Sequence, residues 1–135
     1  MSILAVFLDA SYLIAFYNES DVHHQKAVEI ARKIDNNEYG LSIISDGIFD
    51  EVISVVLRKF GKEKAKLFAK NIVNSIFIVY GDKNIFTKAL SIFNNSKDNF
   101  SFTDCTSQAI IEIAKIQYIA TFDKLFEKLK INVIN

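Results

Sequence analysis

Four acidic residues stand where an acid is unfavourable for packing and useful for chemistry: Asp9, Glu51, Asp104 and Asp123. Asp9 and Asp123 follow apolar runs, Glu51 lies inside an apolar helix candidate, and Asp104 opens another. If the fold brings the four together, several negative charges share one site. That arrangement is costly unless a divalent cation or a shared proton neutralises it. The four acids therefore predict a metal site.

Two of the acids follow candidate strands. Asp9 comes directly after Ala5–Leu8, and Asp123 comes three residues after Tyr118–Ala120. In an open parallel sheet, ligands bind beyond the carboxyl ends of strands, near the point where the strand order reverses. If these two strands are neighbours, the two acids face each other across that crevice. The alternative is that each is an ordinary solvated loop acid.

The helix that carries Glu51 is predicted to bury it. Glu51 lies three residues after Ile48 and four before Val55, so the helical period predicts that it projects from the buried face. A lone buried carboxylate costs several kcal/mol unless it is paired or bound to a metal. The alternative pairs Glu51 with Arg58, or with a lysine elsewhere in the chain.

Asp104 is explained most easily by local helix chemistry. It follows Thr103, which could cap the helix, and an acid in the first turn is favoured by the helix dipole alone. Only the other three acids raise its weight as a site residue.

Smaller polar residues near the acids have ordinary explanations as well as functional ones. Ser11 and Thr121 each lie two residues from an acid and could hydrogen-bond it or a metal-bound water. Cys105 is expected to be a small packing residue. His24 lies on the apolar face of a helix, where a packed, hydrogen-bonded histidine is commoner than a metal ligand, and His23 points elsewhere.

Short apolar segments alternate with segments of helical period along the whole chain. The predicted strands are Ala5–Leu8, Leu41–Ser45, Ile76–Tyr80, Tyr118–Ala120 and Asn132–Ile134. The predicted helices cover residues 11–16, a segment capped by Asp21 and reaching Ile34, and residues 48–60, 62–73, 82–93, 103–116 and 125–129. This alternation predicts an α/β fold, a parallel sheet with helices on both faces. No Pro, repeat or linker divides residues 1–135, so we expect a single domain.

The overall composition predicts no particular partner. The chain has 135 residues, half of them hydrophobic, with 16 basic and 16 acidic side chains. Contact with nucleic acid must therefore come from a local basic patch. Such a patch begins with Arg58 and Lys59 on the helix that carries Glu51 and continues with Lys62 on the next helix, a placement that suits steering of a phosphate backbone. Such a run is otherwise a solvated helix face.

Cysteine content and the opening segment indicate where the protein works. A single cysteine excludes an intrachain disulfide and suits a reducing cytoplasm. The apolar stretch at the start is too short for a signal peptide or a membrane span. A soluble cytoplasmic protein without membrane contact is expected.

Five segments together resemble the PIN domain, in particular the small VapC-type toxin endoribonucleases. Phe7–Ala15 is similar to the opening strand, first acid and hydroxyl residue of that family, and Asp21–Ala27 to the start of its second helix. Asp50–Ser54 and Phe102–Ser107 resemble the segments with the second and third acids, and Ala120–Phe126 the closing Thr-x-Asp element. The resemblance spans almost the whole chain.

The resemblance implies a three-layer sandwich around a five-stranded parallel sheet in the order 3-2-1-4-5. It also implies that all four acids hold Mg²⁺ or Mn²⁺ for cleavage of single-stranded RNA, with Ser11 and Thr121 supporting them. A homodimer and a separately encoded antitoxin partner are further implications. One departure is Ala10, which stands where many members carry Thr or Ser.

Three functions are compatible with these observations. The first is a metal-dependent ribonuclease, the toxin of a toxin–antitoxin pair. The second is a catalytically silent PIN-like module that binds RNA or protein, for which Ala10 is the only hint. The third, a structure-specific DNA nuclease or phosphatase, ranks lower because the chain is short. Three aromatic residues, Tyr12, Phe16 and Tyr17, are expected at a subunit contact.

Overall fold

Five parallel strands form the centre of the computed structural model, which describes residues 4–135. The strands are β1 (Ala5–Leu8), β2 (Leu41–Ser45), β3 (Phe77–Val79), β4 (Tyr118–Ala120) and β5 (Asn132–Ile134). Their order is β3-β2-β1-β4-β5, and every neighbouring pair is parallel. The predicted α/β class and strand order are confirmed.

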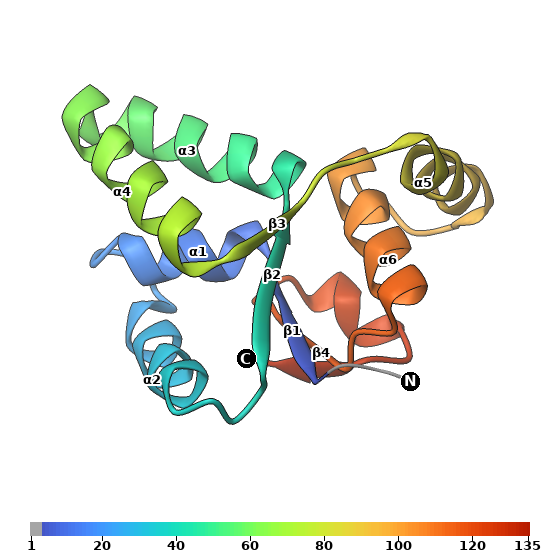
Figure 1. The fold of residues 1–135 in the computed structure, drawn as a ribbon, viewed down its shortest axis with the longest axis horizontal. Helices are drawn as coiled ribbons and strands as arrows, with labels where there is room; N and C mark the ends of the chain where they lie inside the picture. The colour runs from blue at the N-terminus through green and yellow to red at the C-terminus, as the bar shows by residue number, and fades with distance from the viewer. Residues whose placement is uncertain (1–3) are drawn as a thin grey trace.

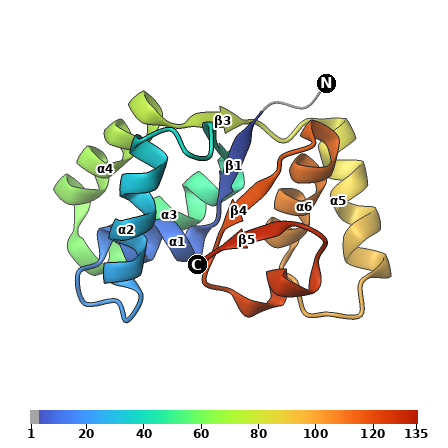
Figure 2. The same ribbon diagram turned by 90° about the horizontal axis from the view of Figure 1, so that it is seen from below.

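Helices cover both faces of this sheet. They are α1 (Ala10–Tyr17), α2 (His24–Asp35), α3 (Asp46–Phe60), α4 (Lys62–Ser75), α5 (Lys83–Asn95), α6 (Phe102–Ala114) and a short 3₁₀ helix, η1 (Lys124–Lys128). Figures 1 and 2 show α1 to α4 on one side of the sheet and the packed pair α5 and α6 on the other. The predicted three-layer sandwich is confirmed.

The central strand explains why one end of the sheet can hold a site. Ala5, Val6, Phe7 and Leu8 of β1 are at most 3% exposed, because helices cover the strand from both faces. Asp9, the first polar residue after this run, therefore lies at the buried carboxyl end of the central strand.

The edge strand differs from its prediction. A strand covered on both faces was expected over Ile76–Tyr80, but β3 has only three residues, and Phe77 and Tyr80 are 57% and 70% exposed. The strand order explains the difference, because β3 lies at the edge of the sheet and contacts only β2.

The start of α2 also differs from its prediction. The helix begins at His24, with His23 as its N-cap residue, rather than at Asp21. Asp21 instead closes the preceding turn, because its carboxylate accepts a hydrogen bond from the His23 amide at 2.8 Å and its backbone oxygen accepts one from His24 at 3.0 Å. The turn fixes the approach to the helix in place of a cap.

Two of the three aromatic residues expected at a subunit contact are part of the protein interior. Tyr12 is 3% exposed, and Tyr17 packs between the rings of Phe60 and Phe68, at centroid distances of 5.3 and 4.5 Å. Only Phe16, at 38%, is exposed. The prediction that all three are surface residues was wrong, because α1 packs against α2 and α3 and buries most of its apolar side chains.

Two expectations concern the chain as a whole. No helix within residues 4–135 is both long enough and apolar enough to cross a membrane. The single domain over residues 1–135 and the cytoplasmic location stay predictions, and residues 1–3 of the opening segment lie outside the described part of the chain.

Candidate active site

The carboxyl ends of β1 and β4 lie side by side, as the resemblance to the PIN domain implied. Leu8 is in register with Ala120, and the backbone amide of Asp9 donates to the carbonyl of Ala120 at 3.0 Å. Thr121 continues from β4, and its amide donates to Ile134 at the end of β5 at 3.1 Å. This pairing places Asp9 and the segment leading to Asp123 at the same end of the sheet, beyond the carboxyl ends of β1 and β4.

Asp9 is a buried carboxylate held by two hydroxyl groups. It is 4% exposed, and its Oδ2 accepts hydrogen bonds from Thr121 Oγ1 at 2.7 Å and from Ser11 Oγ at 2.9 Å. Each hydroxyl has one proton to donate. Both hydroxyls contact Oδ2, and neither contacts Oδ1. The hydrogen bonds predicted for Ser11 and Thr121 are present.

The two hydroxyl oxygens are themselves fixed by the backbone beyond β4. Ser11 Oγ accepts from the amide of Phe122, and Thr121 Oγ1 accepts from the amide of Asp123, each at 3.0 Å. Two relays, each of backbone amide to hydroxyl to carboxylate, therefore converge on Asp9. They couple the orientation of Asp9 to the position of the segment that carries Asp123.

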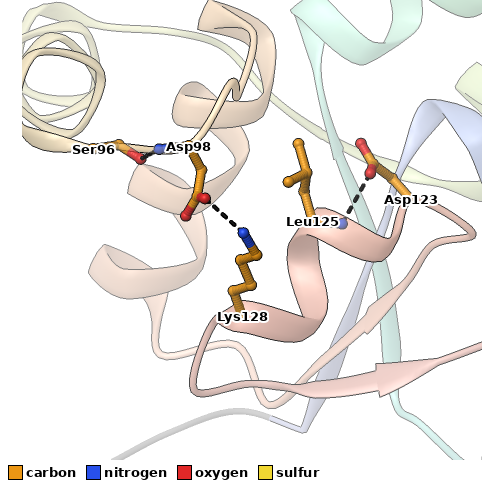
Figure 3. Close-up of polar contacts among 5 residues, drawn as sticks. All are labelled: Ser96, Asp98, Asp123, Leu125 and Lys128. Carbon is orange, nitrogen blue, oxygen red and sulfur yellow. Dashed lines mark hydrogen bonds and ion pairs between the residues drawn. The ribbon is translucent and has the colours of Figure 1, made fainter.

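Asp123 caps the short helix after β4. Its Oδ1 accepts a hydrogen bond from the Leu125 amide at 3.0 Å, which Figure 3 shows at the start of η1. At the other end of η1, Lys128 pairs with Asp98 at 2.7 Å and ties the helix to the loop before α6. Asp123 is half-buried, and it is fixed by the hydrogen bond of its amide to Thr121 on one side and of its carboxylate to Leu125 on the other.

Asp104 sits in the first turn of α6 and belongs to a capping box. Its Oδ2 accepts from the Ser101 amide, and its own amide donates to Ser101 Oγ, both at 3.0 Å. The prediction that Thr103 caps the helix was wrong, because Ser101 occupies the N-cap position and its hydroxyl reaches the amide three residues on. Local helix chemistry thus accounts for the placement of Asp104 without excluding a second role.

Glu51 is exposed rather than buried, which corrects its prediction. The face of α3 that packs on the core runs through Ile48, Val52 and Val56, each at most 1% exposed. Glu51 precedes Val52 by one residue, about 100° around the helix, so it lies at the margin of this face. Its carboxylate can therefore move, unlike that of Asp9.

The four acids, named here the acid cluster, act on one another electrostatically. Burial raises the pKa of Asp9, against the lowering effect of the Thr121 and Ser11 hydroxyls, and the charge of Asp123 adds to the rise. Although Glu51 is an exposed residue, partial desolvation of its carboxyl group raises its pKa, with further rises from the charges of Asp9 and Asp104.

The pKa of Asp104 is raised by the same combination. Burial is the largest cause, and the charges of Asp9 and Asp123 add to it, while hydrogen bonds from Ser101 oppose the rise. Every charge acting on these three carboxyl groups is another carboxylate. The structure therefore brings the four acids within electrostatic reach and concentrates negative charge there, which a divalent cation would relieve.

The oxygen ligands of the acid cluster fit Mg²⁺ or Mn²⁺ held largely through water better than a metal ion coordinated by protein side chains alone. Within residues 4–135, no three His, Cys, Asp or Glu side chains are arranged as a ready-made metal site. The cluster offers only oxygen donors, which suit Mg²⁺ and Mn²⁺. Because Mg²⁺ keeps several waters and uses one or two carboxylates, these residues fit an ion held largely through water.

The other candidate residues lie apart from the acid cluster. Arg58, Lys59 and Lys62 are exposed, and Arg58 is seven residues beyond Glu51, about 10 Å along the axis of α3. Cys105 is fully buried in the core, as predicted. His24 is half-buried and its Nδ1 lies 2.8 Å from the Ala15 carbonyl oxygen, which confirms the expectation of a packed, hydrogen-bonded side chain.

A profile of one known family matches this chain from end to end. The PIN domain profile covers residues 6–132. The chain belongs to the PIN domain family. In this PIN domain Asp9 and Asp123 follow β1 and β4, Asp104 lies in the first turn of α6, and Glu51 lies in the second turn of α3.

Known proteins similar to this PIN domain include ribonucleases and toxins. A "VapC ribonuclease" of Archaeoglobus fulgidus is 29% identical over 127 residues, which are 91% of this chain and 80% of that protein. The fold is shared by VapC20 of Mycobacterium tuberculosis, described as a sarcin-ricin loop cleaving toxin. Its TM-score is 0.82 at 21% identity, with 93% and 95% of the two chains covered.

A second solved structure with this fold is a toxin–antitoxin complex from Klebsiella pneumoniae. Its TM-score is 0.72 at 12% identity, and 96% of each chain is covered. At these identities the structural matches establish a common fold.

One contact near the acid cluster was not predicted from the sequence. The imidazole of His23 stacks on the ring of Phe122, with centroids 4.4 Å apart and planes 3° apart. The two residues are far apart in the sequence, and no local pattern pairs them. Only the topology, which brings the turn before α2 beside the end of β4, creates this contact.

Proposed function

We propose that this PIN domain is a metal-dependent endoribonuclease that hydrolyses phosphodiester bonds of single-stranded RNA. The observation that carries the proposal is the buried Asp9 carboxylate at the centre of four mutually repelling acids. Such a concentration of negative charge destabilises the fold and is explained if it serves to bind a cation. The similarity to a VapC ribonuclease supports RNA as the substrate.

Within this proposal the acids have different tasks. Asp9, Asp104 and Asp123 would hold one or two ions of Mg²⁺ or Mn²⁺, directly or through water, while the Ser11 and Thr121 hydroxyls keep Asp9 in place. A bound ion of this kind lowers the pKa of a water and stabilises charge on the scissile phosphate. The exposed Glu51 would contribute a further ligand or orient the attacking water.

Three surface properties belong to the same proposal. Arg58, Lys59 and Lys62 would attract the RNA backbone to the end of α3 rather than contact the scissile phosphate. The solved toxin–antitoxin complex with this fold supports an antitoxin as protein partner, and hence a role as toxin. A homodimer is proposed as the working form.

The decisive experiment is cleavage of labelled RNA by the purified protein. We expect single-stranded RNA to be cut with Mg²⁺ or Mn²⁺ present, EDTA to stop the reaction, and DNA of the same sequence to stay intact. RNA binding without cleavage at any metal concentration would instead support a silent binding module. Ala10, which stands where many members of the family carry Thr or Ser, is the observation that favours that alternative. Cleavage of DNA at a similar rate would indicate the third function, a DNA nuclease.

A further inference from the structure

A pair of stacked rings forms the rim of the acid cluster on the side of α2. His23 and Phe122 lie with their planes 3° apart and their centroids 4.4 Å apart, and His23 is exposed while Phe122 is half-buried. The outer ring is therefore accessible, while the inner ring fixes its orientation.

The pair is tied to the buried acid through two hydrogen bonds. The amide of Phe122 donates to Ser11 Oγ at 3.0 Å, and that hydroxyl donates to Asp9 Oδ2 at 2.9 Å. Phe122 also stands between Thr121 and Asp123 in the sequence, one residue from each. The backbone of Phe122 is therefore part of the hydrogen-bond relay that holds Asp9, and the pair adjoins the segment that carries Asp123.

The turn that carries His23 is held in place by its own hydrogen bonds. Asn18 Oδ1 accepts from the Ser20 amide at 3.0 Å, and Asp21 Oδ1 accepts from the His23 amide at 2.8 Å. The neighbouring His24 anchors the same turn to the end of α1 through the Ala15 carbonyl, at 2.8 Å. The two adjacent histidines therefore have different environments. His24 holds the turn through a hydrogen bond, whereas the ring of His23 lies at the surface.

The chemistry of this rim suits a nucleobase. Flat rings at the edge of a single-strand binding site stack on bases of any sequence, because every base has a π-face. Val22, 89% exposed, adds apolar surface next to His23.

We propose that the stacked pair of His23 and Phe122 binds a nucleobase of the single-stranded RNA, next to the phosphate that is cut. The proposal rests on the function proposed above, since it names how that substrate is positioned. His23 is a positioning residue: it holds the base and does not take part in bond cleavage.

The test compares two fluorescein-labelled probes, a 12-nucleotide oligo(A) and an abasic chain of the same length. Binding is measured by fluorescence anisotropy at fixed salt with Asp104→Asn protein, which we expect not to cut the probe. The matched variants are His23→Ala, His23→Phe and Gln25→Ala, the last being another exposed residue at the start of α2. All alter surface side chains, so the fold is expected to survive, and circular dichroism spectra and melting temperatures check that it does.

We expect His23→Ala to weaken binding of oligo(A) by about 5- to 150-fold, the range for losing one base–aromatic stack. Binding of the abasic chain should be unchanged, His23→Phe should restore most of the loss, and Gln25→Ala should have no effect. Equal losses on both probes would overturn the proposal, because His23 would then only hold the turn. No loss on oligo(A) would overturn it as well.

Failure of this proposal and failure of the proposed function give different results. If the wild-type protein cuts RNA with Mn²⁺ but His23→Ala binds both probes like the wild type, only the stacking proposal fails. If the base-dependent loss is found but the wild-type protein never cuts RNA, the stacking site stands and the ribonuclease proposal fails. If neither probe binds, the stacking proposal fails.

Discussion

Replacing Asp104 by Asn should remove activity and leave the metal-free protein as stable as the wild type or more so. The amide oxygen of Asn can still accept the hydrogen bond from the Ser101 amide, so the capping box survives. The negative charge that Asp9 and Asp123 repel is lost. The substitution therefore separates the structural role of Asp104 from its electrostatic one.

The size of the effect follows from two opposing contributions. A pKa raised in the folded state means that the ionised carboxylate destabilises the fold. Because Asp104 is partly exposed, each of the two repelling charges costs roughly 0.5–1 kcal/mol, the upper part of the range for surface charge pairs. Against this, an acid in the first turn of a helix contributes about 0.3–1 kcal/mol through the helix dipole, which Asn loses. We expect a net change of about 0 to +1.5 kcal/mol, a rise in melting temperature of up to roughly 6 °C.

The assay is thermal unfolding with EDTA and again with Mn²⁺, with Asp82→Asn as the control. Asp82 also caps a helix through its carboxylate, which accepts from Ile85 at 2.9 Å, but it lies outside the acid cluster. Asp82→Asn should change the free energy of unfolding by less than about 0.5 kcal/mol. With Mn²⁺ the wild type should gain more stability than Asp104→Asn, because an ion that binds only the folded state stabilises it by mass action.

Two results would refute this reasoning. The first is a fall in the melting temperature of Asp104→Asn in EDTA by more than about 3 °C relative to Asp82→Asn. The second is cleavage of RNA by Asp104→Asn at the wild-type rate with Mn²⁺ present. The first would show that Asp104 serves the helix alone, and the second that it has no part in the reaction.

Three further predictions follow from the same geometry. Thr121→Val should lower the free energy of unfolding in urea by about 2–4 kcal/mol, since the buried Asp9 carboxylate loses a hydrogen-bond donor. Thr121→Ser should recover most of this loss, and equal unfolding free energies for the two variants would contradict the relay. In EDTA, the unfolding free energy should increase as the pH falls from neutrality towards about 4, the ordinary pKa of Asp and Glu, because acids whose folded-state pKa is raised stabilise the fold when protonated and destabilise it when ionised. A steady decrease over this range would contradict this. Joint replacement of Arg58, Lys59 and Lys62 by Gln should raise KM at low salt with kcat unchanged, and should weaken the salt dependence of RNA binding. An unchanged salt dependence would exclude a role of these side chains in attracting the RNA backbone.

The residue pattern was sufficient to predict a parallel sheet and the two acids that follow its strands, while the strand order came from the resemblance to the PIN domain. Central strands covered on both faces are continuous apolar runs, so Ala5–Leu8 and Tyr118–Ala120 stand out, and the acids that follow them lie at strand ends by necessity. The edge strand β3 was harder, because its exposure depends on its neighbours and not on its own residues.

What the sequence could not predict depends on contacts between distant segments or on which side of a helix packs against the core. Glu51 was placed on the buried face of α3, but a shift of one residue in that face leaves it exposed. The cap of α6 was assigned to Thr103, but the capping hydrogen bonds are made by Ser101, two residues earlier. The stacking of His23 on Phe122 and the meeting of two hydroxyls on one oxygen of Asp9 arise only from the tertiary fold.

The measurement that tests the central claim most directly is the cleavage rate of Asp9→Asn beside that of Asp82→Asn. Both variants, and the wild type, are purified together and incubated with labelled single-stranded RNA and Mn²⁺. Because Asp9 is the buried centre of the acid cluster, we expect its replacement to reduce the rate by at least about 100-fold. Asp82→Asn should cut RNA at the wild-type rate. An Asp9→Asn rate within twofold of the wild type would contradict the claim that the acid cluster is the active site.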